Sequence, residues 1–331
     1  MALLDLDRDR AESVAQVHGG GKARAFAVDA TDVERLAAAL SDADVLVNSA
    51  SYRVNLEAMR ACLESRSHYL DLGGLYWMTQ RQLELHPEFE RAGLLAVLGI
   101  GSSPGKTNLM AARGRRALGE APDEIEVAAA ARDPAASSDD RLRLPYALRT
   151  LLDELTLEPV VLREGQPERV PPLTDGGIVD FGDPIGTSET VYTLHSELAS
   201  FGESFGCREA SFRLSLSAPL LDRLRQLVGA SAEEIEAVAR EAAPQSNETV
   251  SVHLVRLTGA GRAVRVQAVT RPYNGVGGSV NSTAAPAAAA VRLLARGSVR
   301  ATGVLPPERC IEPDELFGEL EARGCTFGIE G

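Results

Sequence analysis

The chain has 331 residues, of which 44% are hydrophobic and 24% charged, a globular composition long enough for two domains. Its 34 basic and 47 acidic residues give a formal net charge of -13, which disfavours binding to nucleic acid or to an anionic membrane. The four cysteines are scattered, without a partner at metal-ligand spacing, so we expect reduced thiols and no metal site. No apolar run approaches the ~20 residues of a membrane span, and we expect a cytoplasmic protein.

The first part of the sequence alternates short apolar strands with amphipathic helices. The expected strands cover residues 2–7, 23–28, 45–48, 68–72 and 94–100. The helices between them cover residues 8–18, 31–40 and 54–63, and a longer helix is broken near Pro87. This alternation predicts an α/β fold, with a parallel sheet covered by helices on both faces.

Near Pro122 the pattern changes to segments in which apolar and polar residues alternate, as at 250–258. Such alternation predicts an open sheet with one solvated face. We therefore divide the chain into a first domain at 1–121 and a mainly antiparallel α+β domain at 122–272, for substrate binding or dimerisation. Residues 273–331 contain an alanine-rich helix with small side chains, and we expect this segment to return to the first domain.

The first expected strand occupies the place of the second strand in a dinucleotide-binding domain. In such domains an acid closes that strand, roughly 20 residues after a glycine-rich turn that holds the pyrophosphate. The sequence has neither an earlier strand nor a G-x-G-x-x-G turn. Because the first strand is central in the usual order 3-2-1-4-5-6, we expect that the chain begins too late, with a shortened protein as the alternative. Cofactor binding would be impaired in either case.

The ends of the expected strands carry the candidate cofactor-binding residues, since ligands of an open parallel sheet bind beyond the carboxyl ends of its strands. Asp5 could accept the hydroxyls of an adenosine ribose and repel a 2′-phosphate, which favours NAD over NADP. Asp7 is the rival position, and a surface acid is the plain alternative. Residues at the second strand end could flank the adenine, and those at the third are small enough for close passage of a cofactor. These candidates are Asp29, Ala30, Asn48, Ser49 and Ala50.

The segment GIGSSPGKTNLM, residues 99–110, follows a strand and opens a helix, as a phosphate-binding loop does. The glycine spacing is wrong for that loop, because Ile100 stands where its first glycine is required. We predict that residues 101–108 contact nicotinamide or a substrate carboxylate rather than ATP, with backbone amides and the lysine favouring an anion. The candidates here are Gly101, Pro104, Gly105, Lys106 and Asn108.

Five segments occur in a distinctive order along the sequence. They read NSASY (48–52), YLDLGG (69–74), GIGSSPGKTNLMA (99–111), TVYTLHSE (190–197) and VLPPE (304–308). Together they resemble the saccharopine dehydrogenase family, which includes saccharopine reductases and the carboxynorspermidine and homospermidine enzymes. The resemblance implies a nicotinamide-binding Rossmann domain and an inserted substrate domain. It also implies reversible oxidation of a C–N bond that joins an amino acid or polyamine to a keto acid or aldehyde.

The resembling segments also supply candidate site residues. His195 could exchange protons with the amine nitrogen, and Glu197 could orient it or hold a cationic substrate, although a histidine satisfied within the fold is the alternative. Gly73 is expected beside the cofactor. Three further residues could line the cleft: Tyr76, Tyr273 and Asn274. Without a metal, hydride transfer would depend on how the nicotinamide is oriented.

The sequence therefore predicts an NAD(P)-dependent oxidoreductase that acts on the CH–NH bond of a secondary amine. Its substrate would be a small amino acid or polyamine derivative, and its assembly a homodimer. The alternative is a non-catalytic protein that keeps the fold for a structural or regulatory role, because the glycine-rich turn is absent.

Overall fold

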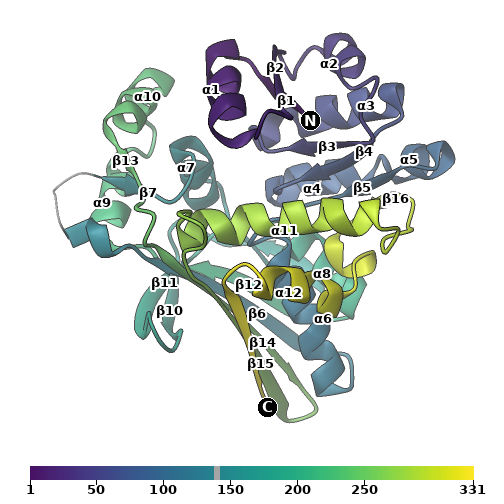
Figure 1. Ribbon diagram of the computed structural model, residues 1–331. Coiled ribbons are helices and arrows are strands. Elements are labelled where there is room, and N and C mark those ends of the chain that lie inside the picture. Colours follow the sequence, from purple (N-terminus) through teal and green to yellow (C-terminus); the bar gives the residue numbers. More distant parts are fainter. Residues whose placement is uncertain (138–141) are drawn as a thin grey trace.

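Figure 1 shows the computed structural model, which describes residues 1–137 and 142–331. The first part of the chain alternates parallel strands and helices. Its strands are β1 (Ala2–Asp5), β2 (Arg24–Ala27), β3 (Val45–Asn48), β4 (His68–Asp71) and β5 (Leu95–Val97). Its helices are α1 (Arg8–His18), α2 (Val33–Ala39), α3 (Asn55–Ser65), α4 (Leu75–Leu83) and α5 (His86–Ala92), with the short η1 (Tyr52–Val54) before α3.

These parallel strands form two sheets rather than one. β1 pairs with β2, whereas β3, β4 and β5 join β16 (Gly303–Leu305) in the order β16-β5-β4-β3. Among the described residues no strand pairs with the second edge of β1 or of β3. The first strand of the usual order 3-2-1-4-5-6 would lie between these two edges. The prediction of an α/β fold with a Rossmann-type parallel sheet is confirmed.

Acidic side chains at the strand ends begin the first helices. Asp7 accepts hydrogen bonds from the N–H groups of Asp9 and Arg10, so it caps α1 rather than ending the strand as expected. Asp32 accepts from the N–H of Arg35 and caps α2. The caps satisfy amide groups that have no partner inside a helix, which explains why the chain turns at these residues.

The second part of the chain forms a nine-stranded, mainly antiparallel sheet, as the alternating segments predicted. Its main path is β10-β11-β12-β6-β14-β15-β17, and β8 and β9 extend it beside β12. Its strands are β6 (Glu124–Arg132), β8 (Val160–Arg163), β9 (Gln166–Arg169), β10 (Asp175–Asp180), β11 (Thr187–Tyr192), β12 (Glu209–Leu214), β14 (Val250–Gly259), β15 (Arg262–Thr270) and β17 (Cys325–Glu330). A separate two-stranded pair consists of β7 (Arg143–Leu144) and β13 (Ala243–Pro244).

Further helices accompany the large sheet, and several of them pack on its strands. They are α6 (Lys106–Leu118), α7 (Leu148–Thr156), α8 (Leu198–Phe205), α9 (Ala218–Gln226), α10 (Ala232–Glu241), α11 (Gly278–Ala295) and α12 (Pro313–Glu321), with the short η2 (Pro134–Ser137) and η3 (Pro307–Arg309). α6 packs on β14 and β15. A Cβ on Gly114 of α6 would lie 2.3 Å from Cδ1 of Leu257, so the glycine permits this close approach.

One hydrophobic core extends across both parts of the molecule. It includes Leu95 of β5, Leu109 of α6, Val255 of β14 and Ala289 of α11. In Figure 1, α11 runs between the parallel sheet and the large sheet. The small alanine side chains of α11 permit close packing, so the helix holds the two parts together.

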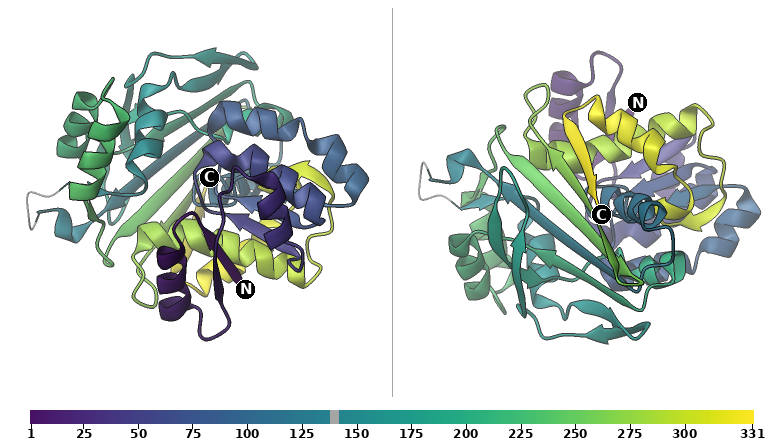
Figure 2. Two further views of the ribbon diagram at one scale, coloured as in Figure 1. Left: turned by 90° about the horizontal axis from the view of Figure 1, so that it is seen from above. Right: turned by 90° about the horizontal axis from the view of Figure 1, so that it is seen from below.

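The last part of the chain contributes a strand to each sheet. β16 pairs in parallel with β5, as expected for a segment that returns to the first domain. β17 instead pairs with β15 in the large sheet, which Figure 2 shows from below. The edge of β15 offers β17 an antiparallel partner, and the expected return of residues 273–331 to the first domain stays a prediction. The domain division itself stays a prediction.

Candidate functional site

A cavity of about 620 Å³ lies between the loops of the parallel sheet and one face of the large sheet. The loops that follow β3, β4 and β5 form one wall. Residues of β6 and β14 form the opposite wall, and α7 and the start of α11 close the sides. A ligand here would contact the carboxyl ends of the parallel strands, where open α/β sheets bind their ligands.

Five of the residues proposed from the sequence line this cavity: Ser49, Ala50, Gly73, Pro104 and His195. Gly73 has φ 128°, and a Cβ there would lie 2.9 Å from the ring of Pro104. Gly99 has φ 67°, and its Cβ would lie 2.4 Å from Cγ of the same proline. Only glycine tolerates such conformations and contacts together, so the loops after β4 and β5 can pack directly on each other.

A buried carboxylate holds these loops in place. Oδ1 of Asp71 accepts hydrogen bonds from the N–H of Gly73 (3.0 Å) and of Gly99 (2.6 Å). Its Oδ2 accepts from Nε2 of Gln82 (2.7 Å) and from the hydroxyl of Tyr69 (3.0 Å). Burial raises the pKa of Asp71, and these hydrogen bonds oppose that rise by stabilising the ionised form. Asp71 lies in the segment YLDLGG, but the sequence did not single it out.

Asn48 belongs to the same network. Its Nδ2 donates to Oδ1 of Asn55 (2.9 Å), its Oδ1 accepts from the N–H of Ala50 (3.1 Å), and Nδ2 of Asn55 donates to Oδ2 of Asp71 (3.2 Å). Asn48 is 7% exposed and does not line the cavity. It therefore positions the loop that carries Ser49 and Ala50.

The candidates for the adenosine side lie at the carboxyl ends of β1 and β2, outside the lining of the cavity. Asp5 accepts the N–H of Asp7 at 2.9 Å. Asp29 accepts the hydroxyl and the N–H of Thr31, which lowers its pKa, and Ala30 packs partly buried against the core of the parallel sheets.

The amide groups at the start of α6 donate hydrogen bonds to the preceding loop and to the first turn of the helix. The N–H of Gly105 donates to Oδ1 of Asn108, that of Lys106 to the carbonyl of Gly101, and that of Thr107 to the carbonyl of Ser102. These amides are not directed to an anion as the sequence analysis expected, because the loop folds back on the first turn of the helix.

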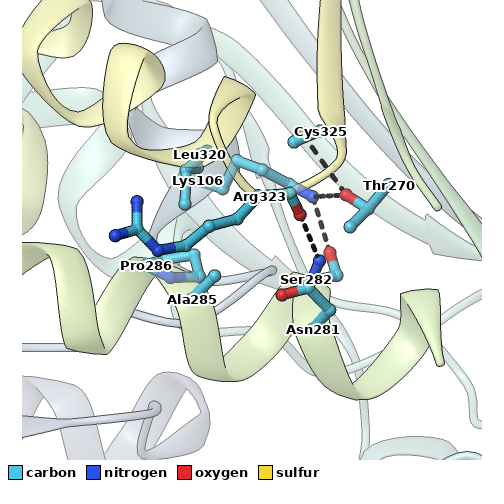
Figure 3. Close-up of a pocket in the computed structure, with 9 residues that line it drawn as sticks. All are labelled: Lys106, Thr270, Asn281, Ser282, Ala285, Pro286, Leu320, Arg323 and Cys325. Carbon is cyan, nitrogen blue, oxygen red and sulfur yellow. Dashed lines mark hydrogen bonds between the residues drawn. The ribbon is translucent and has the colours of Figure 1, made fainter. Parts of the chain in front are cut away.

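Lys106 points away from the cavity. Figure 3 shows its amine between Ser282 of α11 and Thr270 of β15, and Nζ donates to both hydroxyls, at 2.6 and 3.1 Å. Burial lowers the pKa of Lys106. Asn108 is also engaged elsewhere, because its Nδ2 donates to Oε2 of Glu308 at 2.8 Å. The structure thus separates both residues from the cavity, since α6 is rotated by its packing on the large sheet.

The other substrate candidates do not line the cavity either. Tyr76 is buried in the core, and its hydroxyl accepts from Nε2 of Gln80 at 3.0 Å. Tyr273 and Asn274 belong to a turn closed by hydrogen bonds between the backbones of Tyr273 and Val276.

His195 does line the cavity and lies between two carboxylates. Its Nδ1 is 3.1 Å from Oε2 of Glu197, and its Nε2 is 3.9 Å from Oε2 of Glu154. The ring stacks on Phe212, with centroids 3.5 Å apart. Burial alone would lower the pKa of His195, but the carboxylates outweigh it, led by Glu197, and raise the pKa above its ordinary value. His195 is thus suited to holding a proton near neutral pH.

Glu197 contacts the imidazole of His195 from outside the cavity. It is 1% exposed, does not line the cavity, and its Oε1 accepts the hydroxyl of Thr107 at 2.9 Å. With one oxygen fixed by Thr107, the other is aimed at Nδ1 of His195. Glu197 therefore orients the imidazole.

Two further residues of this group, Glu154 and Tyr146, were not singled out from the sequence, and both line the cavity. The hydroxyl of Tyr146 donates to Oε2 of Glu154, and burial raises the pKa of Glu154. A signal was present, because Glu154 stands between Leu151 and Leu155 on the apolar face of α7. An acid on an apolar helix face needs a partner.

Comparison with known proteins supports the family resemblance. Residues 1–97 match the family model described as "Saccharopine dehydrogenase NADP binding domain". The resemblance to the saccharopine dehydrogenase family is confirmed. Carboxynorspermidine synthase of Vibrio alginolyticus is 25% identical over 204 residues, which cover 58% of this chain and 48% of that protein. Carboxyaminopropylagmatine dehydrogenase of Synechocystis sp. is 26% identical over 238 residues, which cover 69% of this chain and 59% of that protein.

These matches span only about half to three fifths of the two curated relatives. A solved structure, apo saccharopine dehydrogenase (L-Glu forming) from Saccharomyces cerevisiae, aligns with a TM-score of 0.71 and 15% identity. That alignment covers 100% of this chain and 94% of the yeast chain, which shows a shared saccharopine dehydrogenase fold.

The match to an NADP binding domain supports a nicotinamide cofactor. The small residues Ser49, Ala50 and Gly73 line the cavity beside the parallel strands. The sequence offers no glycine-rich turn for the pyrophosphate. In the described part of the chain no metal-binding group of His, Cys, Asp and Glu is found, and no helix is long and apolar enough to cross a membrane.

Proposed function

We propose that the protein is an NAD(P)-dependent oxidoreductase that acts on the CH–NH bond of a secondary amine formed from an amino acid or polyamine and a carbonyl compound. The observation that carries this proposal is the position of His195. It lies in one cavity with the loops that follow β3 and β4. A substrate held there would meet a nicotinamide on one side and a proton-holding imidazole on the other.

In this proposal side chains of the protein donate or accept the proton, and the bound nicotinamide supplies or accepts the hydride. When Nδ1–H of His195 donates to Glu197, Nε2 is left to exchange a proton with the amine nitrogen. Glu154 and Tyr146 border the same space and would contact the substrate beside that nitrogen. The orientation of the substrate then depends on the cavity walls, which exclude water as a ligand fills them.

The cofactor preference and the substrate class follow from two further observations. Asp5 stands at the end of β1, where an acid favours the ribose of NAD over the phosphate of NADP. The names of the curated relatives point to carboxylated polyamines. We therefore propose NAD as the preferred cofactor and an amino acid or polyamine derivative as the substrate.

The proposal can be tested with the protein expressed from its complete reading frame. We expect oxidation of NADH, and less of NADPH, only when an amino acid or diamine and a carbonyl compound are present together. His195→Asn should lower kcat by at least ~100-fold because general acid–base catalysis is lost. The exposed His18→Asn on α1 serves as the matched control and should change kcat little. No turnover with any pair of substrates would instead favour a non-catalytic role.

A further inference from the structure

One wall of the cavity carries two buried polar atoms that the proposed reaction does not use. Nδ1 of His253 and Oγ of Ser279 are buried, and neither finds a hydrogen-bond partner within the described part of the chain. His253 is only 3% exposed, and both residues line the cavity. Burying such an atom without a partner costs free energy, so its retention on a cavity wall points to a ligand.

The fold brings these side chains together at the end of the cavity near α11. Ser251 and His253 are two residues apart on β14, so they face the same side of the sheet, and both line the cavity. The strand neighbours of His253 are Ala129 and Ala268, whose small side chains leave room above the strands. The N–H of Gly278 donates to the carbonyl of Thr249, the residue before β14. This hydrogen bond holds the start of α11, with Ser279, beside β14.

The acidic groups of the cavity are engaged elsewhere. Glu154 accepts from Tyr146 and lies near His195. Asp133 accepts from the N–H and the hydroxyl of Ser246, at 2.9 and 2.6 Å. Neither of these hydrogen bonds involves His253, Ser251 or Ser279, so both carboxylates are engaged away from the end of the cavity near α11.

Two basic side chains, Lys106 and His195, act electrostatically on His253. Burial, and then the positive charges of Lys106 and His195, hold the pKa of His253 well below its ordinary value. The imidazole is consequently neutral at neutral pH and keeps one N–H to donate. A neutral imidazole that donates its N–H can hydrogen-bond an anionic acceptor such as a carboxylate.

We propose that His253, together with the hydroxyls of Ser251 and Ser279, binds a carboxylate group of the substrate. This inference rests on the proposed function and assigns the end of the cavity that the acid-containing part of the substrate occupies. The side chains supply the hydrogen bonds, since the N–H groups of Gly278 and Ser279 already donate to Thr249. The opposite, amine-bearing part of the substrate then lies toward His195 and Glu154.

The test measures binding without cofactor or turnover. The chain has five histidines, so the imidazole signals in a two-dimensional NMR spectrum can be assigned by single substitutions. The probes are glutarate and 1,5-diaminopentane, which have chains of equal length and opposite charges. We expect glutarate to shift the His253 signal saturably and the diamine to leave it unchanged.

Calorimetry on variants then identifies the contacts. His253→Leu should weaken glutarate binding at least ~10-fold, the loss expected for a hydrogen bond to a charged group. His253→Gln, which keeps a donor, should recover part of the affinity, and Ser279→Ala should weaken binding several-fold. His18→Leu is the control and should bind as the unchanged chain does. Thermal unfolding of each variant shows whether it is folded, and Ser279→Ala keeps the test open if His253→Leu is not.

Three results would overturn the carboxylate site: no saturable shift with glutarate, a shift confined to His195, or stronger binding of the diamine at His253. The two proposals can fail separately. If glutarate binds at His253 but the protein oxidises no reduced cofactor, the proposed oxidoreductase function is contradicted and the carboxylate site is supported. If the enzyme turns over and His253→Leu changes neither KM nor kcat, the oxidoreductase function is supported and the carboxylate site is contradicted.

Discussion

At the scale of single residues, buried polar groups organise this protein. Asp71 accepts four hydrogen bonds from the side chains and backbone around it, in addition to the longer one from Asn55. Two of the four come from loop glycines, so the carboxylate stabilises the site walls directly. The same network orients Asn48 and the residues that follow it.

Asp71→Asn is predicted to lower the free energy of unfolding by about 3 kcal/mol, because an amide nitrogen would face buried donors in place of a carboxylate oxygen. Urea unfolding followed by circular dichroism measures this change. Asp180→Asn is the matched control, since exposed Asp180 also accepts the N–H of a glycine two residues later, at 2.9 Å. It should change the stability by less than about 1 kcal/mol. Equal losses in the two variants would mean that the Asp71 network does not stabilise the fold.

At the scale of elements, the fit of α6 on the large sheet decides which side chains reach the cavity. Gly114 lets the helix approach Leu257 of β14 and Val266 of β15. With that face of the helix against the sheet, Lys106 at its first turn is directed to Thr270 and Ser282. The residue predicted to bind an anion is therefore part of the interface between α6, β15 and α11.

Gly114→Ala is predicted to destabilise the protein by about 1–3 kcal/mol, because the new methyl group would overlap Leu257. The matched control is Gly318→Ala in α12, where no atom outside the neighbouring helix backbone lies within 4 Å of the new Cβ. That substitution should stabilise the protein by about 0.5–1 kcal/mol through helix propensity. Thermal unfolding distinguishes the two, and a Gly114→Ala protein at least as stable as the unchanged chain would refute the close packing.

At the scale of the whole molecule, stability is unevenly distributed. β6 and β14 are interior strands of a nine-stranded sheet, whereas β1 and β2 pair only with each other among the described strands. The exposed apolar side chains of the molecule include Val14, Val17 and Phe26, which lie on α1 and β2. A two-stranded sheet with little cover is marginal by itself.

We therefore predict that the backbone amides of β1 and β2 exchange with deuterium well before those of β6 and β14. The difference should be more than about 100-fold in protection, since local opening of the small sheet leaves the large core intact. Hydrogen exchange followed by mass spectrometry measures it at peptide resolution. β4 serves as the internal control, because it is buried and paired on both sides by β3 and β5. Equal protection of β1 and β14 would contradict the prediction.

The sequence by itself determined the features that depend on local periodicity and short motifs. The alternation of strands and helices, the end of β3 at Asn48 and the start of α6 at Lys106 could be predicted, because the apolar period and the glycines mark them directly. The pairing of His195 with Glu197 could also be anticipated, since the two residues are two positions apart in one resembling segment.

Only the tertiary structure decided which distant side chains share the cavity. Glu154 on α7 and His253 on β14 reach it with His195 because three separate elements converge there, and no local pattern encodes that convergence. The direction of Lys106 was decided in the same way, by the packing of α6 against β14 and β15 rather than by its own loop. Side-chain direction follows the rotation of a whole helix, which depends on what the helix packs against.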